Sequence, residues 1–140
     1  MYTNILVAIE HSPADRTVID HVQQLAKLTG ASLLLVHVAD GWAARHYDEL
    51  ALRESEEMKE DRAYLEQIRE ELAGHGFATR THLAMGDPAT ELVKVAQAQS
   101  VDLIAMSTHG HRFLNDLVRG TTVNRVRHLV KIPILLVRAQ

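Results

Sequence analysis

Short apolar runs recur along the chain, separated by longer segments in which apolar residues follow a helical spacing. Residues 5–9 and 33–38 are almost entirely apolar, which is typical of strands that are covered on both faces. Residues 101–106 and 134–137 repeat this pattern closer to the carboxyl end. Residues 79–83 are more polar and β-branched, so we expect them to form an edge strand. The pattern therefore predicts five strands.

The segments between these runs predict four helices. The first ends at Gly30, a residue type that is favoured at helix C-termini. A long helix is expected over roughly residues 47–73. The next begins at Asp87 and Pro88, because Asp suits the N-cap and Pro suits the first helical position. The last helix is expected over about residues 121–130.

This alternation of strands and helices predicts the fold class. It implies a parallel sheet with right-handed crossovers and helices on both faces, which is a doubly wound α/β fold. A length of 140 residues suits a single domain over residues 1–140. The composition, 46% hydrophobic and 24% charged, is typical of a globular protein.

Charge and cysteine content exclude several function classes. With 15 Lys and Arg against 18 Asp and Glu, the formal net charge of −3 offers no general attraction to nucleic acid or to anionic lipid. The chain has no cysteine, so disulfides, thiol catalysis and thiolate metal sites are excluded. The first apolar run is too short for a signal peptide or a membrane span. We therefore expect a cytoplasmic protein that binds neither nucleic acid nor membrane.

A candidate ligand site follows the fourth predicted strand. In open parallel sheets, ligands bind outside the carboxyl ends of the strands, where the strand order reverses. The segment 107–110 ends in Gly110, which can adopt a positive φ and turn backbone N–H groups toward a phosphate. Nine residues later, Gly120 and Thr121 stand at the expected helix start, where the helix dipole favours an anion. The chain contains no Walker loop and no G-x-G-x-x-G motif, which excludes P-loop and dinucleotide-binding sites.

The segment from Ser107 to Thr121 resembles the nucleotide motif of the universal stress protein family, G-x-x-G followed by nine residues and G-[ST]. The opening strand with residues 10–12 after it, the segment 86–89 and the last strand also resemble that family, in the same order. The resemblance implies a five-stranded sheet with strand order 3-2-1-4-5. It also implies a non-catalytic stress-response or regulatory protein that binds ATP or a related adenine nucleotide, with or without Mg²⁺.

The resemblance also assigns the ligand contacts. Around the adenine and ribose it places Ala8, Ile9, Glu10 and Val38. Near the ribose and phosphates it places Ser107, Thr108, Gly110, Gly120, Thr121, Thr122 and Val123. His109, inside the first half of the motif, is a further candidate for a phosphate contact.

Three of these positions depart from the family pattern. Glu10 replaces the usual Asp and moves the carboxylate one methylene further out. Ser107 replaces the first Gly, so a turn that needs a positive φ would be strained there. Val123 replaces a common Ser or Thr and removes a hydroxyl donor. These departures keep open an alternative function, a dimeric protein-interaction module of the same family that binds no nucleotide.

A slow ATPase is a second alternative. In-line attack on a phosphate needs a positioned water and charge stabilisation. His109 and Arg119 could contribute to the latter, but the motif offers no dedicated general base and no paired carboxylates. The sequence therefore favours binding over catalysis, and no catalytic residue is assigned.

Two further features concern metals and partners. The nine histidines are scattered and include no His-x-x-x-His helix pair, so no metal site is expected. The last strand, from Ile134 to Val137, is apolar and is expected at a sheet edge, which invites pairing with another chain. The family resemblance implies a homodimer formed through this strand.

Overall fold

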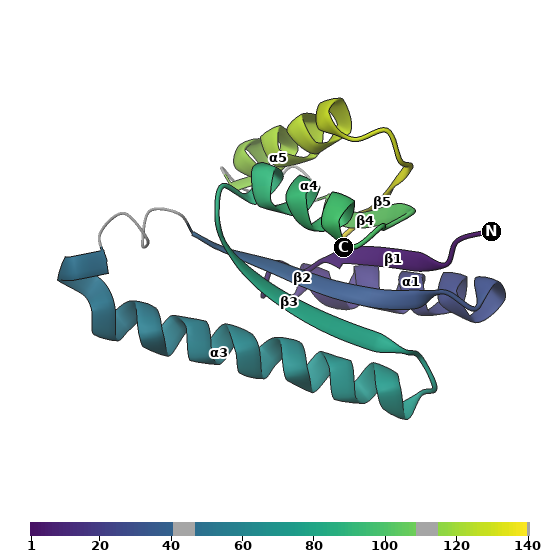
Figure 1. Cartoon of the computed structure of the whole chain (residues 1–140), viewed down its shortest axis with the longest axis horizontal. Coiled ribbons are helices and arrows are strands. Elements are labelled where there is room, and N and C mark those ends of the chain that lie inside the picture. The colour runs from purple at the N-terminus through teal and green to yellow at the C-terminus, as the bar shows by residue number, and fades with distance from the viewer. Residues whose placement is uncertain (41–46, 109–114, 140) are drawn as a thin grey trace.

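The computed structural model describes residues 1–40, 47–108 and 115–139, and in them strands and helices alternate as predicted (Figure 1). The five strands are β1 (Asn4–Ala8), β2 (Ser32–Asp40), β3 (Thr79–Gly86), β4 (Leu103–Thr108) and β5 (Ile134–Arg138). The helices are α1 (Ala14–Thr29), α3 (Tyr47–Gly74), α4 (Pro88–Ala98) and α5 (Asn115–Leu129).

All five strands form one sheet in the order β3-β2-β1-β4-β5, and every neighbouring pair is parallel. The predicted order 3-2-1-4-5 and the α/β fold class are therefore confirmed. The strand at 79–83 is an edge strand, as its polar pattern indicated. Chain crossovers run in one direction from β1 to β2 and β3, and in the other direction to β4 and β5. The strand order thus reverses between β1 and β4, which is where ligands bind in such sheets.

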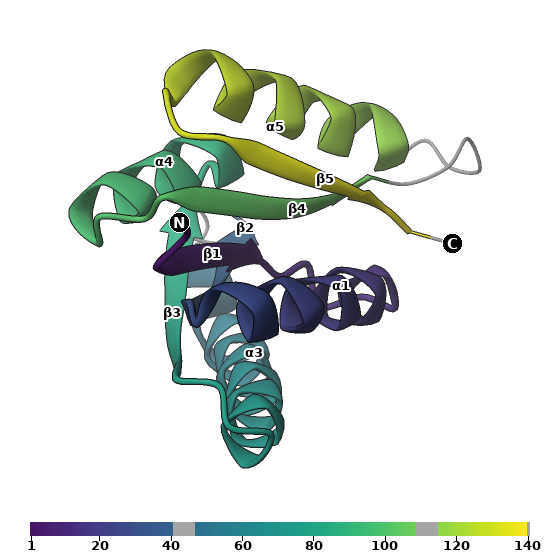
Figure 2. The ribbon, with the colours of Figure 1, turned by 90° about the vertical axis from the view of Figure 1, so that its right-hand side faces the viewer.

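The helices cover both faces of the sheet. Helices α1 and α3 lie on one face, and α4 and α5 lie on the other (Figure 2). Successive side chains of β1 alternate between the two cores, because side chains along a strand point to opposite faces. Ile5 and Val7 pack in the core with α1 and α3, whereas Leu6 packs in the core with α4 and α5.

Helix termini match the sequence signals. Asp87 caps α4, because its side chain accepts a hydrogen bond from the backbone N–H of Thr90 at 3.0 Å, and Pro88 follows at the first position. Gly30 ends α1 with φ 74° and donates its N–H to the carbonyl of Ala26. Among the described residues, no helix combines the length and apolar character needed to span a bilayer.

The start of the last helix was predicted wrongly. Helix α5 begins at Asn115 rather than at about residue 121, so Gly120 lies within the helix and not at its first turn. A glycine inside a helix costs only about 1 kcal/mol relative to alanine, which is too little to end the helix there.

Candidate functional site

A crevice opens between the carboxyl ends of β1 and β4. The pairing of these two strands stops at Val7 and Ala105. On the outer sides the pairing continues, from β1 to β2 as far as Ala8 and from β4 to β5 as far as Thr108. The backbone of Ile9 still donates to β2, at 2.8 Å from the carbonyl of Val36. The two central strands therefore separate while each keeps its other neighbour.

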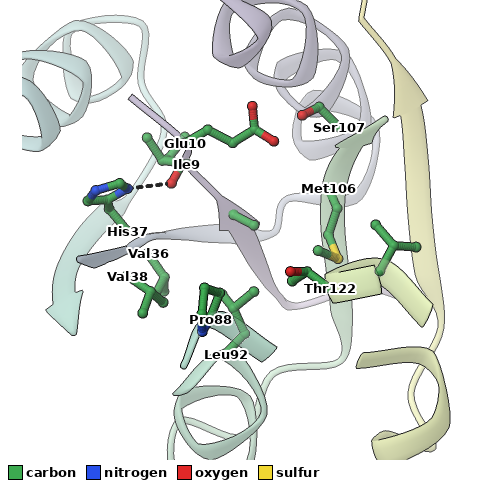
Figure 3. A pocket seen from close by; sticks show the side chains of 12 residues that line it. Ile9, Glu10, Val36, His37, Val38, Pro88, Leu92, Met106, Ser107 and Thr122 are labelled. Carbon is green, nitrogen blue, oxygen red and sulfur yellow. Dashed lines mark hydrogen bonds between the residues drawn. The ribbon is translucent and has the colours of Figure 1, made fainter. Parts of the chain in front are cut away.

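A cavity of about 240 Å³ lies at this crevice (Figure 3). It brings together several residues that the sequence assigned to the ligand: Ala8, Ile9, Glu10, Val38, Ser107, Thr122 and Val123. It is completed by residues that the sequence did not assign: Val36, His37, Pro88, Leu92 and Met106. Residues from β1, β2, α4, β4 and α5, distant in sequence, thus share one site.

Thr108 is the one remaining predicted residue whose side chain the structure describes, and it is not among the residues that line the cavity. Thr108 ends β4 directly after Ser107. Gly120 and Thr121 belong to α5, where the backbone N–H groups of a helix interior bond to carbonyls of the preceding turn. The expectation that these two residues stand at a helix start is therefore wrong, while their assignment as ligand contacts stays a prediction. His109 and Gly110 lie outside the described residues.

The wall toward α4 and β4 is apolar. Leu92 and Met106 are buried, and Val36 of β2, which also lines the cavity, is fully buried. A flat, weakly polar ring can pack against such side chains, which are typical of pockets for small molecules. Pockets that enclose a drug-sized ligand measure roughly 300–1,000 Å³, so a cavity of about 240 Å³ suits a base and sugar better than a whole nucleoside triphosphate.

The opposite end of the cavity is polar. The carboxylate of Glu10 accepts a hydrogen bond from the hydroxyl of Ser12 at 3.0 Å. Ser107 is 5% exposed, and its hydroxyl has no hydrogen-bond partner among the residues that the structure describes. Backbone strain at Ser107, which the sequence predicted, is absent. The residue lies in β4, and the only non-glycine residues with positive φ in the described ranges are His11 and Ser100. The position of the family's first Gly is thus extended backbone, which a serine adopts freely.

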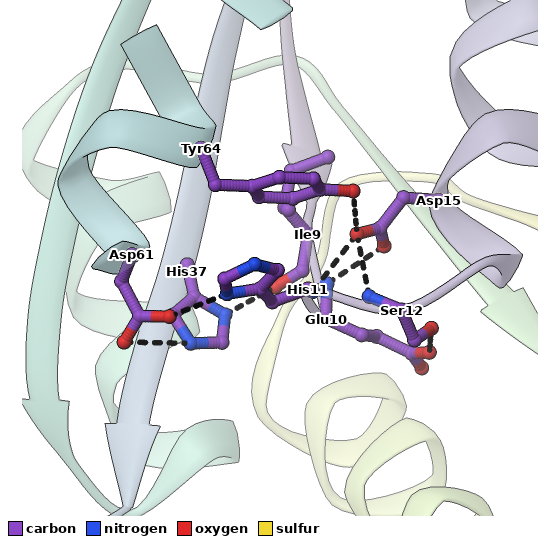
Figure 4. Close-up of polar contacts among 8 residues, drawn as sticks. All are labelled: Ile9, Glu10, His11, Ser12, Asp15, His37, Asp61 and Tyr64. Carbon is purple, nitrogen blue, oxygen red and sulfur yellow. Dashed lines mark hydrogen bonds and ion pairs between the residues drawn. The ribbon is translucent and has the colours of Figure 1, made fainter. Parts of the chain in front are cut away.

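The turn that carries Glu10 is held by Asp15, a residue that the sequence analysis missed. Asp15 is 1% exposed, and its carboxylate accepts from the backbone N–H groups of Glu10 (2.8 Å), His11 (2.8 Å) and Ser12 (3.1 Å) (Figure 4). The hydroxyl of Tyr64, on α3, also donates to it at 2.7 Å. Burial, followed by this hydrogen bond to an acidic partner, raises the pKa of Tyr64.

Two histidines and Asp61 continue this network toward the cavity. The Nδ1 of His11 lies 2.7 Å from one carboxylate oxygen of Asp61, and the Nε2 of His37 lies 3.5 Å from the other. The Nδ1 of His37 lies 2.8 Å from the carbonyl oxygen of Ile9, so that nitrogen carries a proton and donates it. The ring of His11 also stacks on Tyr64, with centroids 4.0 Å apart. These contacts join α3 to the end of β1.

The sequence gives only weak signals of this network. His37 interrupts an apolar strand, and Asp61 and Tyr64 lie three residues apart on one face of the long helix. Their partners are distant in the chain, so only the fold identifies the contacts. In the part of the chain that the structure describes, no group of three or more His, Cys, Asp or Glu side chains is arranged to hold a metal ion.

The family model of the universal stress protein family matches residues 1–138. Universal stress protein MJ0577 from Methanocaldococcus jannaschii is 26% identical over 155 residues, which cover 99% of this chain and 96% of that protein. Universal stress protein YxiE from Bacillus subtilis is 29% identical over 151 residues, which cover 99% of this chain and 100% of that protein.

Solved structures of members of this family have the same fold as this chain. That of MJ0577 superimposes with a TM-score of 0.88 at 26% identity, covering 100% of this chain and 98% of that one. A universal stress protein in complex with cAMP and one from Archaeoglobus fulgidus in complex with dAMP share the fold. Their TM-scores are 0.71 and 0.72 at 18% and 19% identity, and the matches cover 99% and 97% of this chain and 98% of each of theirs. With its sequence and its fold both matched over nearly the whole chain, the protein belongs to the universal stress protein family.

Proposed function

We propose that this protein binds ATP or a related adenine nucleotide between β1 and β4, and that it acts as a non-catalytic regulatory protein. The observation that carries the proposal is the cavity itself, which joins an apolar wall to a polar end at the reversal of strand order. The solved relatives with cAMP and with dAMP support adenine as the base.

The adenine would lie against Val38, Leu92 and Met106, and the ribose would lie near Glu10. The phosphates would extend out of the cavity past the carboxyl end of β4, because the cavity is too small for all three. Thr122 would contribute a hydroxyl from α5. Any bound Mg²⁺ would accompany the phosphates.

Isothermal titration with ATP, ADP, AMP and cAMP tests this proposal, with Ala8→Leu as the variant that fills the cavity. Ala8 lines the cavity, and added side-chain volume there should weaken binding about tenfold or more. Ala98→Leu makes the same change at an exposed position of α4 and should leave the affinity unchanged. If the native chain gives no heat at millimolar nucleotide, or if both variants bind like the native chain, the proposal is wrong.

One observation favours the second candidate, an interaction module without nucleotide. Val123 lines the cavity and has no hydroxyl, whereas the family pattern often has Ser or Thr at this position. On this reading, Val123→Ser should create nucleotide binding that the native chain lacks. Turnover of ATP should in either case stay below about one per minute, far under the usual enzyme range.

We also propose that the chain forms a homodimer through β5. This strand is an edge of the sheet, and its Leu136 remains 47% exposed. An apolar edge strand of this kind is a template for pairing with a second chain.

A further inference from the structure

Ser107 carries a buried hydroxyl that no residue in the described ranges satisfies. The residue is 5% exposed, lines the cavity, and has no hydrogen-bond partner for its Oγ among the described residues. Buried hydroxyls are normally paired, because leaving one unpaired is unfavourable. A group inside the cavity is therefore expected to pair with Ser107.

The neighbourhood of Ser107 restricts what that group can be. In Figure 3 the Ser107 hydroxyl, at the end of β4, points toward the side of the cavity that holds the carboxyl group of Glu10. Glu10 accepts a hydrogen bond from the hydroxyl of Ser12, and a carboxylate can accept from several donors at once. A phosphate placed beside a carboxylate would be repelled, whereas a hydroxyl can donate to the carboxylate and accept from the serine.

We propose that Ser107 makes the site selective for a ribose over a deoxyribose. The Ser107 Oγ–H donates to the oxygen of one sugar hydroxyl, and the proton of that hydroxyl is donated to Glu10. A glycine at this position has no side chain to make the first of these bonds. The inference rests on the proposed function, since it assigns the sugar of the proposed nucleotide.

The test compares adenosine, 2′-deoxyadenosine and 3′-deoxyadenosine by isothermal titration, on the native chain and on Ser107→Ala. The native chain should bind adenosine about 3- to 10-fold more tightly than one of the two deoxynucleosides. Ser107→Ala should weaken the binding of adenosine by a similar factor and leave the affinity for that deoxynucleoside unchanged. The affinity for AMP should fall by the same factor as that for adenosine, because the phosphate makes no contact with Ser107.

Ser32→Ala is the matched control. Ser32 begins β2 at the opposite end of the sheet, where its hydroxyl lies 3.2 Å from the carbonyl of Thr3, so its removal should not change any affinity. Thermal unfolding of each variant reports whether it remains folded.

Three results would overturn the inference while nucleotide binding stands. The native chain could bind adenosine and both deoxynucleosides equally, a result that needs no variant. Ser107→Ala could leave adenosine binding unchanged, as when water satisfies the hydroxyl. Ser107→Ala could also weaken the binding of AMP alone, which would place a phosphate at Ser107. If the native chain binds no adenine compound at all, the proposed function fails and this inference fails with it.

Discussion

At the scale of single residues, Asp15 determines the shape of the turn that presents Glu10. Its carboxylate accepts three backbone N–H groups and the hydroxyl of Tyr64 while it is 1% exposed. Asp15→Ala should lower the free energy of unfolding by about 3 kcal/mol, because it leaves buried donors unpaired. Urea denaturation measures the loss.

Asp20 provides the comparison for this substitution. It lies on the same helix, its side chain is 60% exposed, and it lies 3.8 Å from Arg16. Asp20→Ala should change the stability by less than about 0.5 kcal/mol. The role given to Asp15 would be rejected if the two variants were equally stable.

The residues of the site were only partly predictable from the sequence. Ala8, Glu10 and Val38 were assigned by the family resemblance, and the structure brings them together because they stand at the ends of neighbouring parallel strands. The backbone strain expected at Ser107 was wrong, because the end of β4 could not be located to within one residue from an apolar run. Asp15 was missed although three of its donors are the neighbouring N–H groups of residues 10–12, because the conformation of that turn has no clear sequence signal and its fourth partner, Tyr64, lies 49 residues away.

At the scale of elements, an ion pair joins the start of α4 to α5. A guanidinium nitrogen of Arg125 lies 2.8 Å from the carboxylate of Asp87. The Arg125 side chain, followed by the hydroxyl and N–H of Thr90, lowers the pKa of Asp87 from 3.8 to about 2. A lowered pKa means that the carboxylate is favoured in the folded chain, so its contribution is present above pH 4 and is lost as the pH falls toward 2.

Asp87→Asn tests this contribution, because asparagine keeps the N-cap and removes the charge. Both groups of the pair are about half exposed, so screening limits the effect to about 0.5–1 kcal/mol at neutral pH and low salt. Unfolding of both proteins should be followed from pH 6 to pH 2. The stability difference should shrink across the acidic end of this range; a difference that is constant with pH would contradict the assignment.

Among the elements, strands and caps were predicted well and one helix start was not. Asp87-Pro88 carries its signal within two adjacent residues, and the structure has the helix there. The start of α5 carried a misleading signal, since Gly120 was taken as a boundary although a single glycine is tolerated inside a helix. The helix-start position expected for Gly120 and Thr121 was wrong for the same reason, and their contact with a phosphate stays a prediction.

At the scale of the whole molecule, the exposed edge at β5 predicts the oligomeric state. Leu136→Lys places a charge on this edge and should convert a dimer to a monomer, because charged residues on edge strands oppose pairing. Leu28→Lys is the control, since Leu28 is 85% exposed and lies on α1 rather than on the edge strand. Sedimentation velocity at micromolar concentration distinguishes the species. A native chain that sediments as a monomer would contradict the proposed dimer.

The central claim, that the crevice between β1 and β4 holds an adenine nucleotide, is tested most directly by a crystal structure of the protein grown with millimolar AMP. We predict electron density for the purine between Val38, Leu92 and Met106, with the sugar at Glu10 and Ser107. A cavity without density for the nucleotide, or a nucleotide bound elsewhere on the molecule, would contradict it.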